Sequence, residues 1–122
     1  MGDHIMKDSE KLEVFRKKQD AYMVKIKDLL FSKNSPFKNE IYELFYLSQF
    51  GESLEIYVFY KNNKILLYNL QNGRTENIKT FILEKLNESG YFKEFNKNVL
   101  FVFDSDENVK KKYKGNYFLR LC

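Results

Sequence analysis

The sequence predicts an α+β fold, a mainly antiparallel sheet of about five strands with helices packed on it. Apolar residues recur every three to four positions in long segments and every second position in shorter ones, which are the repeats of helices and strands. Hydrophobic residues make up 43% of the 122 residues and aromatic residues 17%, so a core forms without disulfides or metals. We expect a single domain over residues 1–122 with the element order α-β-β-β-α-β-α-β.

The first helix is expected over residues 8–33. Asp8 or Ser9 is placed to cap it, and Pro36 ends it because the residue before a proline avoids helical geometry. One face carries an apolar stripe broken by a glutamine: Leu12, Phe15, Gln19, Tyr22, Ile26 and Leu29. Residues 1–6 are expected to be disordered or left over from cloning, with Met6 as the natural start.

Residues 40–70 are expected to form a three-stranded meander. Its strands are residues 41–50, 54–60 and 65–70, with a turn at 51–53. Side chains alternate between two faces along the second strand. Asn62 and Asn63 suit a tight hairpin, because asparagine tolerates positive φ.

The rest of the chain alternates between helices and strands. A helix is expected over 75–88, with Gly90 as its C-terminal residue. Residues 91–96 form either a short helix or a packed loop. The apolar run 99–103 is typical of a strand covered on both faces. A short helix over 106–113 and a last strand over 117–121 complete the fold.

Composition argues against most catalytic chemistry. The single histidine, His4, lies in the first six residues, so Ser-His or Cys-His catalysis and histidine metal sites are not expected. The single cysteine, Cys122, is the last residue and rules out an intramolecular disulfide, which suits a reducing compartment. No glycine-rich phosphate loop is present. We expect no enzyme activity and no cofactor.

The apolar runs are too short to cross a bilayer, and no secretory signal precedes the charged N-terminal segment. We therefore expect a cytoplasmic protein without a membrane partner. The net charge of +4 comes entirely from the second half of the chain. This is a weaker basic character than committed nucleic-acid binders usually show.

An acidic cluster is the one candidate for catalytic chemistry. Asp104, Asp106 and Glu107 follow the apolar strand, at the place where ligand sites gather in open sheets. Their carboxylates suit Mg²⁺, which prefers oxygen ligands. The simpler interpretation, which we favour, is that Asp104 or Ser105 caps the next helix while the acidic residues offset its dipole.

Basic and aromatic residues supply the candidate binding surface. The basic cluster near the C-terminus is either a solvated helix end or a patch for nucleic acid or an acidic partner, with tyrosines available to stack on bases. Tyrosines in 40–70, including Tyr42 and Tyr46, serve core edges and interfaces equally. The candidate partner-binding residues are Tyr57, Tyr60, Tyr68, Lys110, Lys111, Lys112, Lys114, Tyr117 and Arg120.

The layout has a long first helix, a Tyr/Phe-rich meander, a helix and a closing segment from Phe103 to Leu121, FDSDENVKKKYKGNYFLRL. It resembles the small cytoplasmic immunity proteins that protect bacteria from their own polymorphic or contact-dependent toxins. The resemblance implies an antitoxin-type protein that binds and neutralises one toxin domain without a cofactor. The sequence is compatible with a monomer and with a homodimer through an exposed strand. The mildly basic charge departs from the acidic immunity proteins that face nucleases. The alternative is a small nucleic-acid-associated protein using the basic C-terminal segment.

Overall fold

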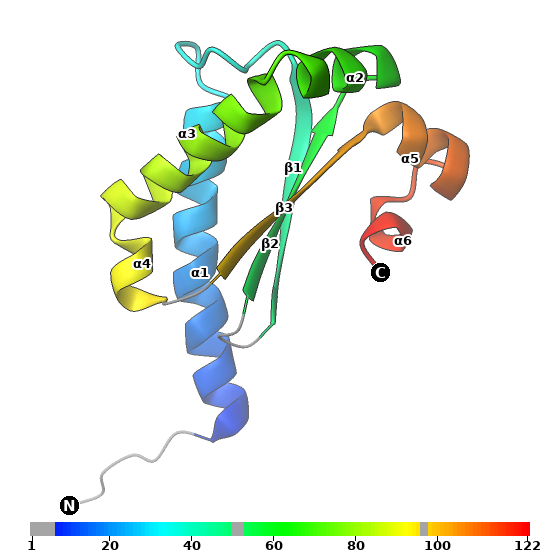
Figure 1. Ribbon diagram of the computed structural model, residues 1–122. Helices are drawn as coiled ribbons and strands as arrows, with labels where there is room; N and C mark the ends of the chain where they lie inside the picture. The colour runs from blue at the N-terminus through cyan, green and yellow to red at the C-terminus, as the bar shows by residue number, and fades with distance from the viewer. Residues whose placement is uncertain (1–6, 50–52, 96–97) are drawn as a thin grey trace, which may run out of the picture.

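The structure, a computed structural model, describes residues 7–49, 53–95 and 98–122. Its elements in chain order (Figure 1) are α1 (Asp8–Leu30), β1 (Ile41–Gln49), β2 (Ser53–Tyr60), α2 (Asn63–Gln71), α3 (Arg74–Ser89), α4 (Tyr91–Glu94), β3 (Asn98–Ser105), α5 (Asp106–Tyr113) and α6 (Tyr117–Leu121). The expectations for residues 1–6, His4 included, and for the turn at 51–52 lie outside the described residues.

The sheet has three strands in the order β1-β2-β3, with β1 antiparallel to β2 and β2 parallel to β3. Parallel neighbours need a crossover of a dozen or more residues, and α2, α3 and α4 supply it. The α+β prediction is confirmed. The antiparallel sheet of about five strands and the predicted order of elements are wrong, because two predicted strands are helices.

The first misassigned segment is 65–70, which belongs to α2 and is not a third strand of a meander. The side chain of Asn62 accepts a hydrogen bond from the Ile65 N–H at 2.9 Å and caps the helix. Asparagine favours both N-caps and hairpin turns, and a six-residue apolar run suits either a strand or a helix. The asparagines therefore begin a helix where a hairpin was expected.

The second misassigned segment is 117–121, which forms the short helix α6. Asn116 caps it by accepting a hydrogen bond from the Leu119 N–H at 3.1 Å. Without a fourth strand beside it, β3 is an edge strand and Leu100 is 52% exposed. The expectation that residues 99–103 are covered on both faces is therefore also wrong.

Helices α1 and α3 cover one face of the sheet and form the main core with it (Figure 1). The helix predicted over 75–88 is confirmed as α3, whose Ile78, Ile82 and Leu86 are fully buried. Gly90 ends α3 with φ at +90°, the left-handed geometry that favours glycine. Helix α1 ends at Leu30, earlier than predicted, and turns that leucine into the core while Leu29 stays 42% exposed.

The other face of the sheet is covered at one end by the C-terminal segment. Helices α5 and α6 lie on the side away from α1 and α3 (Figure 1). The ring of Tyr117 in α6 packs 4.8 Å from that of buried Phe59 and 5.2 Å from that of Phe45. The far end of this face keeps Leu47 and Leu100 exposed. The predicted helix over 106–113 is confirmed as α5.

Candidate functional site

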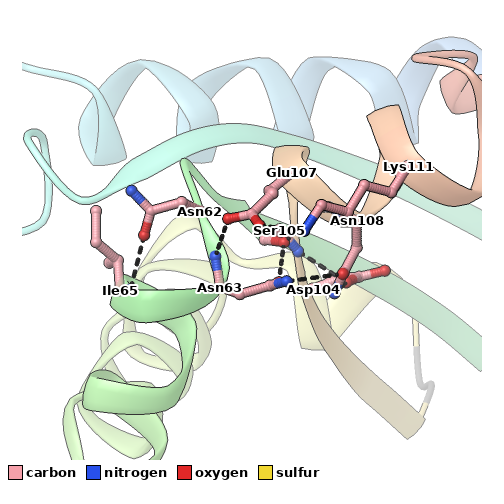
Figure 2. A network of polar contacts seen from close by, with 8 residues as sticks. All are labelled: Asn62, Asn63, Ile65, Asp104, Ser105, Glu107, Asn108 and Lys111. Carbon is pink, nitrogen blue, oxygen red and sulfur yellow. Dashed lines mark hydrogen bonds and ion pairs between the residues drawn. The ribbon is translucent and has the colours of Figure 1, made fainter.

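The carboxyl ends of β2 and β3 lie side by side, with Tyr60 in register with Ser105, and each strand leads toward a helix. Asn63, the first residue of α2, binds the start of α5 (Figure 2). Its amide Nδ2 donates to Asn108 Oδ1 at 3.0 Å, and its backbone N–H donates to Glu107 Oε1 at 3.1 Å. Ser105 Oγ donates to Asn63 Oδ1 and accepts from the Asn108 N–H, so it caps α5 and joins the two helices.

Asp104, the next-to-last residue of β3, is fully engaged by hydrogen bonds. Its Oδ1 accepts from the Ser105 N–H and from Asn108 Nδ2, both at 2.8 Å. Its Oδ2 accepts from Arg120 Nε in α6 at 2.7 Å. Burial by itself raises the pKa of Asp104, but the hydrogen bonds from Arg120, Asn108 and Ser105 outweigh it and hold the pKa below its usual range.

The remaining acidic residues pair with the lysines that follow them on α5. Asp106 Oδ2 lies 2.8 Å from Lys110 Nζ, and Glu107 Oε2 lies 2.7 Å from Lys111 Nζ. The hydroxyl of Tyr117 donates to Asp106 Oδ1 at 2.6 Å. Burial and this bond to a carboxylate raise the pKa of Tyr117 far above its ordinary value. The three carboxylates and three of the five cations thus form one ion-paired network.

This pairing favours the capping interpretation over the metal one. The cap is Ser105, one of the two residues predicted for that role. Among residues 7–49, 53–95 and 98–122, no group of three or more His, Cys, Asp and Glu side chains is placed to hold a metal ion. The thiol of Cys122 is exposed and free. Nothing in the described part of the chain points to enzyme activity.

The five basic residues predicted to bind a partner divide into two groups. Lys110, Lys111 and Arg120 each pair with a carboxylate of the acidic cluster. Lys112 and Lys114 are exposed and form no ion pair with any described residue. Of the five basic residues predicted to bind a partner, only Lys112 and Lys114 therefore have charges that no described carboxylate pairs with.

The four predicted tyrosines lie in three different environments. Tyr60 is fully buried, with its hydroxyl 3.1 Å from Thr75 Oγ1, so no surface partner reaches its side chain. Tyr57 and Tyr117 are partly buried under and within the C-terminal segment. Tyr68 is 63% exposed on α2, away from the ion-paired network. The tyrosines do not form one recognition face.

Two apolar residues that the sequence analysis missed stand out on α6. Phe118 is 76% exposed and Leu119 is 53% exposed, while Tyr117 and Arg120 on the same helix contact the sheet and β3. We call Phe118 and Leu119, with Lys112 and Lys114 just before them, the α6 surface. A strand prediction hides this arrangement. If residues 117–121 are read as a helix with Tyr117 and Arg120 facing the sheet, residues 118 and 119 face outward.

Comparisons with models of protein families, with curated proteins and with solved structures give no match. In the described part of the chain, no helix has the length and apolar character needed to cross a membrane.

Proposed function

We propose that this protein is an antitoxin-type immunity protein that binds a cognate bacterial toxin domain through the α6 surface. The carrying observation is the outward display of Phe118 and Leu119 on a helix that is fixed to the sheet. Large apolar side chains exposed next to one another mark interaction sites. Large side chains that fill a pocket of the partner supply much of the binding energy of protein interfaces.

Two hydrogen bonds hold α6 in place, and this order before binding supports tight binding. Arg120 is held by Asp104 at 2.7 Å, and Tyr117 is held by Asp106 at 2.6 Å. Both bonds lie on the inner side of the helix, so they restrain it without occupying Phe118 or Leu119. A surface that is ordered before binding loses less conformational entropy when the partner docks.

The charges favour a protein partner over nucleic acid. Binding to nucleic acid draws on cations that are free to neutralise phosphates. Three of the five cations in the C-terminal segment are already paired with carboxylates. Lys112 and Lys114 suit acidic side chains at the rim of a protein interface. Gel-shift at two salt concentrations tests the alternative, since steeply salt-dependent binding supports nucleic acid as the partner.

Co-expression with the toxin gene expected beside its own tests the proposal. The wild-type protein should restore growth, and the Phe118→Asp variant should not. The matched control is Leu67→Asp on α2, where the leucine is 56% exposed but lies on a different helix. If Leu67→Asp fails to restore growth while Phe118→Asp still does, the interface does not lie on the α6 surface. A wild-type protein that neither rescues growth nor forms a complex would refute the proposed function.

A further inference from the structure

The outer edge of β1 carries no further described strand, although its Leu44 N–H donates to the Glu43 Oε1 atom at 3.0 Å. In the described sheet β1 pairs with β2 alone, so half of its N–H and C=O groups face away from any strand. Helix α1 runs lengthwise beside it (Figure 1). Between them lies a groove made of two adjoining cavities of about 210 and 370 Å³, which share Asp20 and Tyr46. A groove beside a free strand edge is suited to an added strand.

The residues that line the larger cavity are distributed symmetrically along both α1 and β1. From α1 it takes Asp20, Met23, Val24 and Lys27, whose midpoint falls between Met23 and Val24. From β1 it takes residues 44–46, centred on Phe45. Early residues of α1 face late residues of β1, so helix and strand run in opposite directions. A two-fold axis perpendicular to the sheet beside Phe45 would relate this protein to a second copy whose α1 and β1 run in the opposite directions. The groove of the second copy would then lie against the groove of the first.

The two-fold rotation places opposite charges of the two copies next to each other at the rim of the groove. Val24 is 58% exposed at the centre, with Asp20 four residues before it and Lys27 three residues after it. In an antiparallel pair of α1 helices, Asp20 of each copy then faces Lys27 of the other, and this contact occurs twice. Glu43 already holds the Lys27 Nζ at 2.6 Å, and an ammonium has further donors for a second carboxylate.

The strand register also allows this pairing. Antiparallel strands keep their side chains on matching faces when Phe45 stands opposite Phe45 of the second copy. Leu47, which is 37% exposed, then lies opposite Glu43 of the second copy. Arg16, Lys27 and Asp20 line the groove, and Glu43 pairs with Lys27 at its rim, so the two charge signs are equal in number. That balance suits a self-complementary surface better than a strongly charged partner.

We propose that β1 and α1 form the interface of a symmetric homodimer with a continuous sheet of both copies. The interface is separate from the α6 surface, so its test does not depend on the proposed function. Analytical ultracentrifugation of the full chain should show a dimer. Asp20→Lys and Lys27→Asp each create two like-charge contacts and should raise the dissociation constant at least about tenfold.

Mixing the two variants gives the sharpest test. In a heterodimer of Asp20→Lys with Lys27→Asp every contact is again between opposite charges, so an equimolar mixture should recover the dimer. Lys25→Asp, at an exposed position on α1 outside the groove lining, is the matched control and should leave dimerisation unchanged. Val24→Arg, at a site that is 58% exposed, should also give monomers. The proposal is overturned by a wild-type protein that stays monomeric at about 100 µM, or by a dimer that none of these variants weakens.

Discussion

The Arg120 guanidinium donates from Nε to Asp104 Oδ2 at 2.7 Å and thereby fastens the last helix to the end of β3. Both side chains are mostly covered, at 21% and 14% exposure. The guanidinium also lies over the rings of Tyr57 and Tyr113 at 5.8 and 5.9 Å. The placement of the α6 surface therefore depends on a contact between two residues sixteen positions apart.

Replacing Arg120 should destabilise the protein more than replacing a lysine of the same segment. Arg120→Met leaves the Asp104 carboxylate partly buried without its cation, and we expect a loss of about 2 kcal/mol in the free energy of unfolding. Lys111→Met breaks an exposed pair and should cost less than about 0.5 kcal/mol. Urea denaturation followed by circular dichroism measures both. Equal losses would show that burial of the Arg120 pair contributes nothing.

Stability should fall in acid partly through Asp104. Its folded-state pKa lies below its ordinary value, because hydrogen bonds from Arg120, Asn108 and Ser105 outweigh the effect of burial. The stabilisation by the charged form is fully present above the unfolded value of about 3.9 and is lost as the pH falls through the folded pKa. Wild type should exceed Asp104→Asn in unfolding free energy at neutral pH, and the gap should shrink from about pH 5 to about pH 2. A gap that stays constant in acid contradicts this.

Ser105 should matter beyond its role as a cap. Ser105→Ala removes the acceptor for the Asn108 N–H and the donor to Asn63, so unfolding free energy should drop by about 1–2 kcal/mol. Asn116→Ala removes the cap of α6 alone. Loss of this cap loosens only the start of a short terminal helix and leaves the core intact, so the global change should be smaller. Chemical denaturation measures both losses. A larger loss for Ser105→Ala than for Asn116→Ala would support the role of Ser105 in joining α2 to α5.

The buried tyrosine separates stability from binding. Tyr60→Phe removes a hydroxyl that lies 3.1 Å from Thr75 Oγ1 in the core and should lower the unfolding free energy by about 1 kcal/mol. Its complex with the toxin domain should keep the same dissociation constant, because the ring never reaches the surface. A weakened complex with unchanged stability would mean that Tyr60 contacts the partner.

Strong periodicity was enough to predict the long helices. Ile78, Ile82 and Leu86 repeat every four residues along α3, and this spacing fits a helix but not a strand. The segments 65–70 and 117–121 have only five or six residues each, too few to separate periods of 2 and 3.6. Both follow an asparagine, which starts turns and helices alike. For residues 65–70 the deciding factor is tertiary, because a parallel pairing of β2 with β3 needs a helical crossover between them.

The candidate site was predicted in part. The sequence pointed to Asp104, Arg120 and the lysines, but it could not show that the acids and bases neutralise each other, because the contact between Arg120 and Asp104 joins separate elements. Lys110 with Asp106 and Lys111 with Glu107 are pairs four apart on a helix, a spacing visible in the sequence. Phe118 stayed unnoticed because its exposure follows from α6 being a helix.

The affinity of the toxin domain for Phe118→Asp, measured by titration calorimetry, tests the central claim most directly. The account predicts a dissociation constant at least about 100-fold higher than that of wild type, with Leu67→Asp unchanged and all three proteins equally folded. The same dissociation constant for Phe118→Asp and wild type would contradict the α6 surface as the binding site.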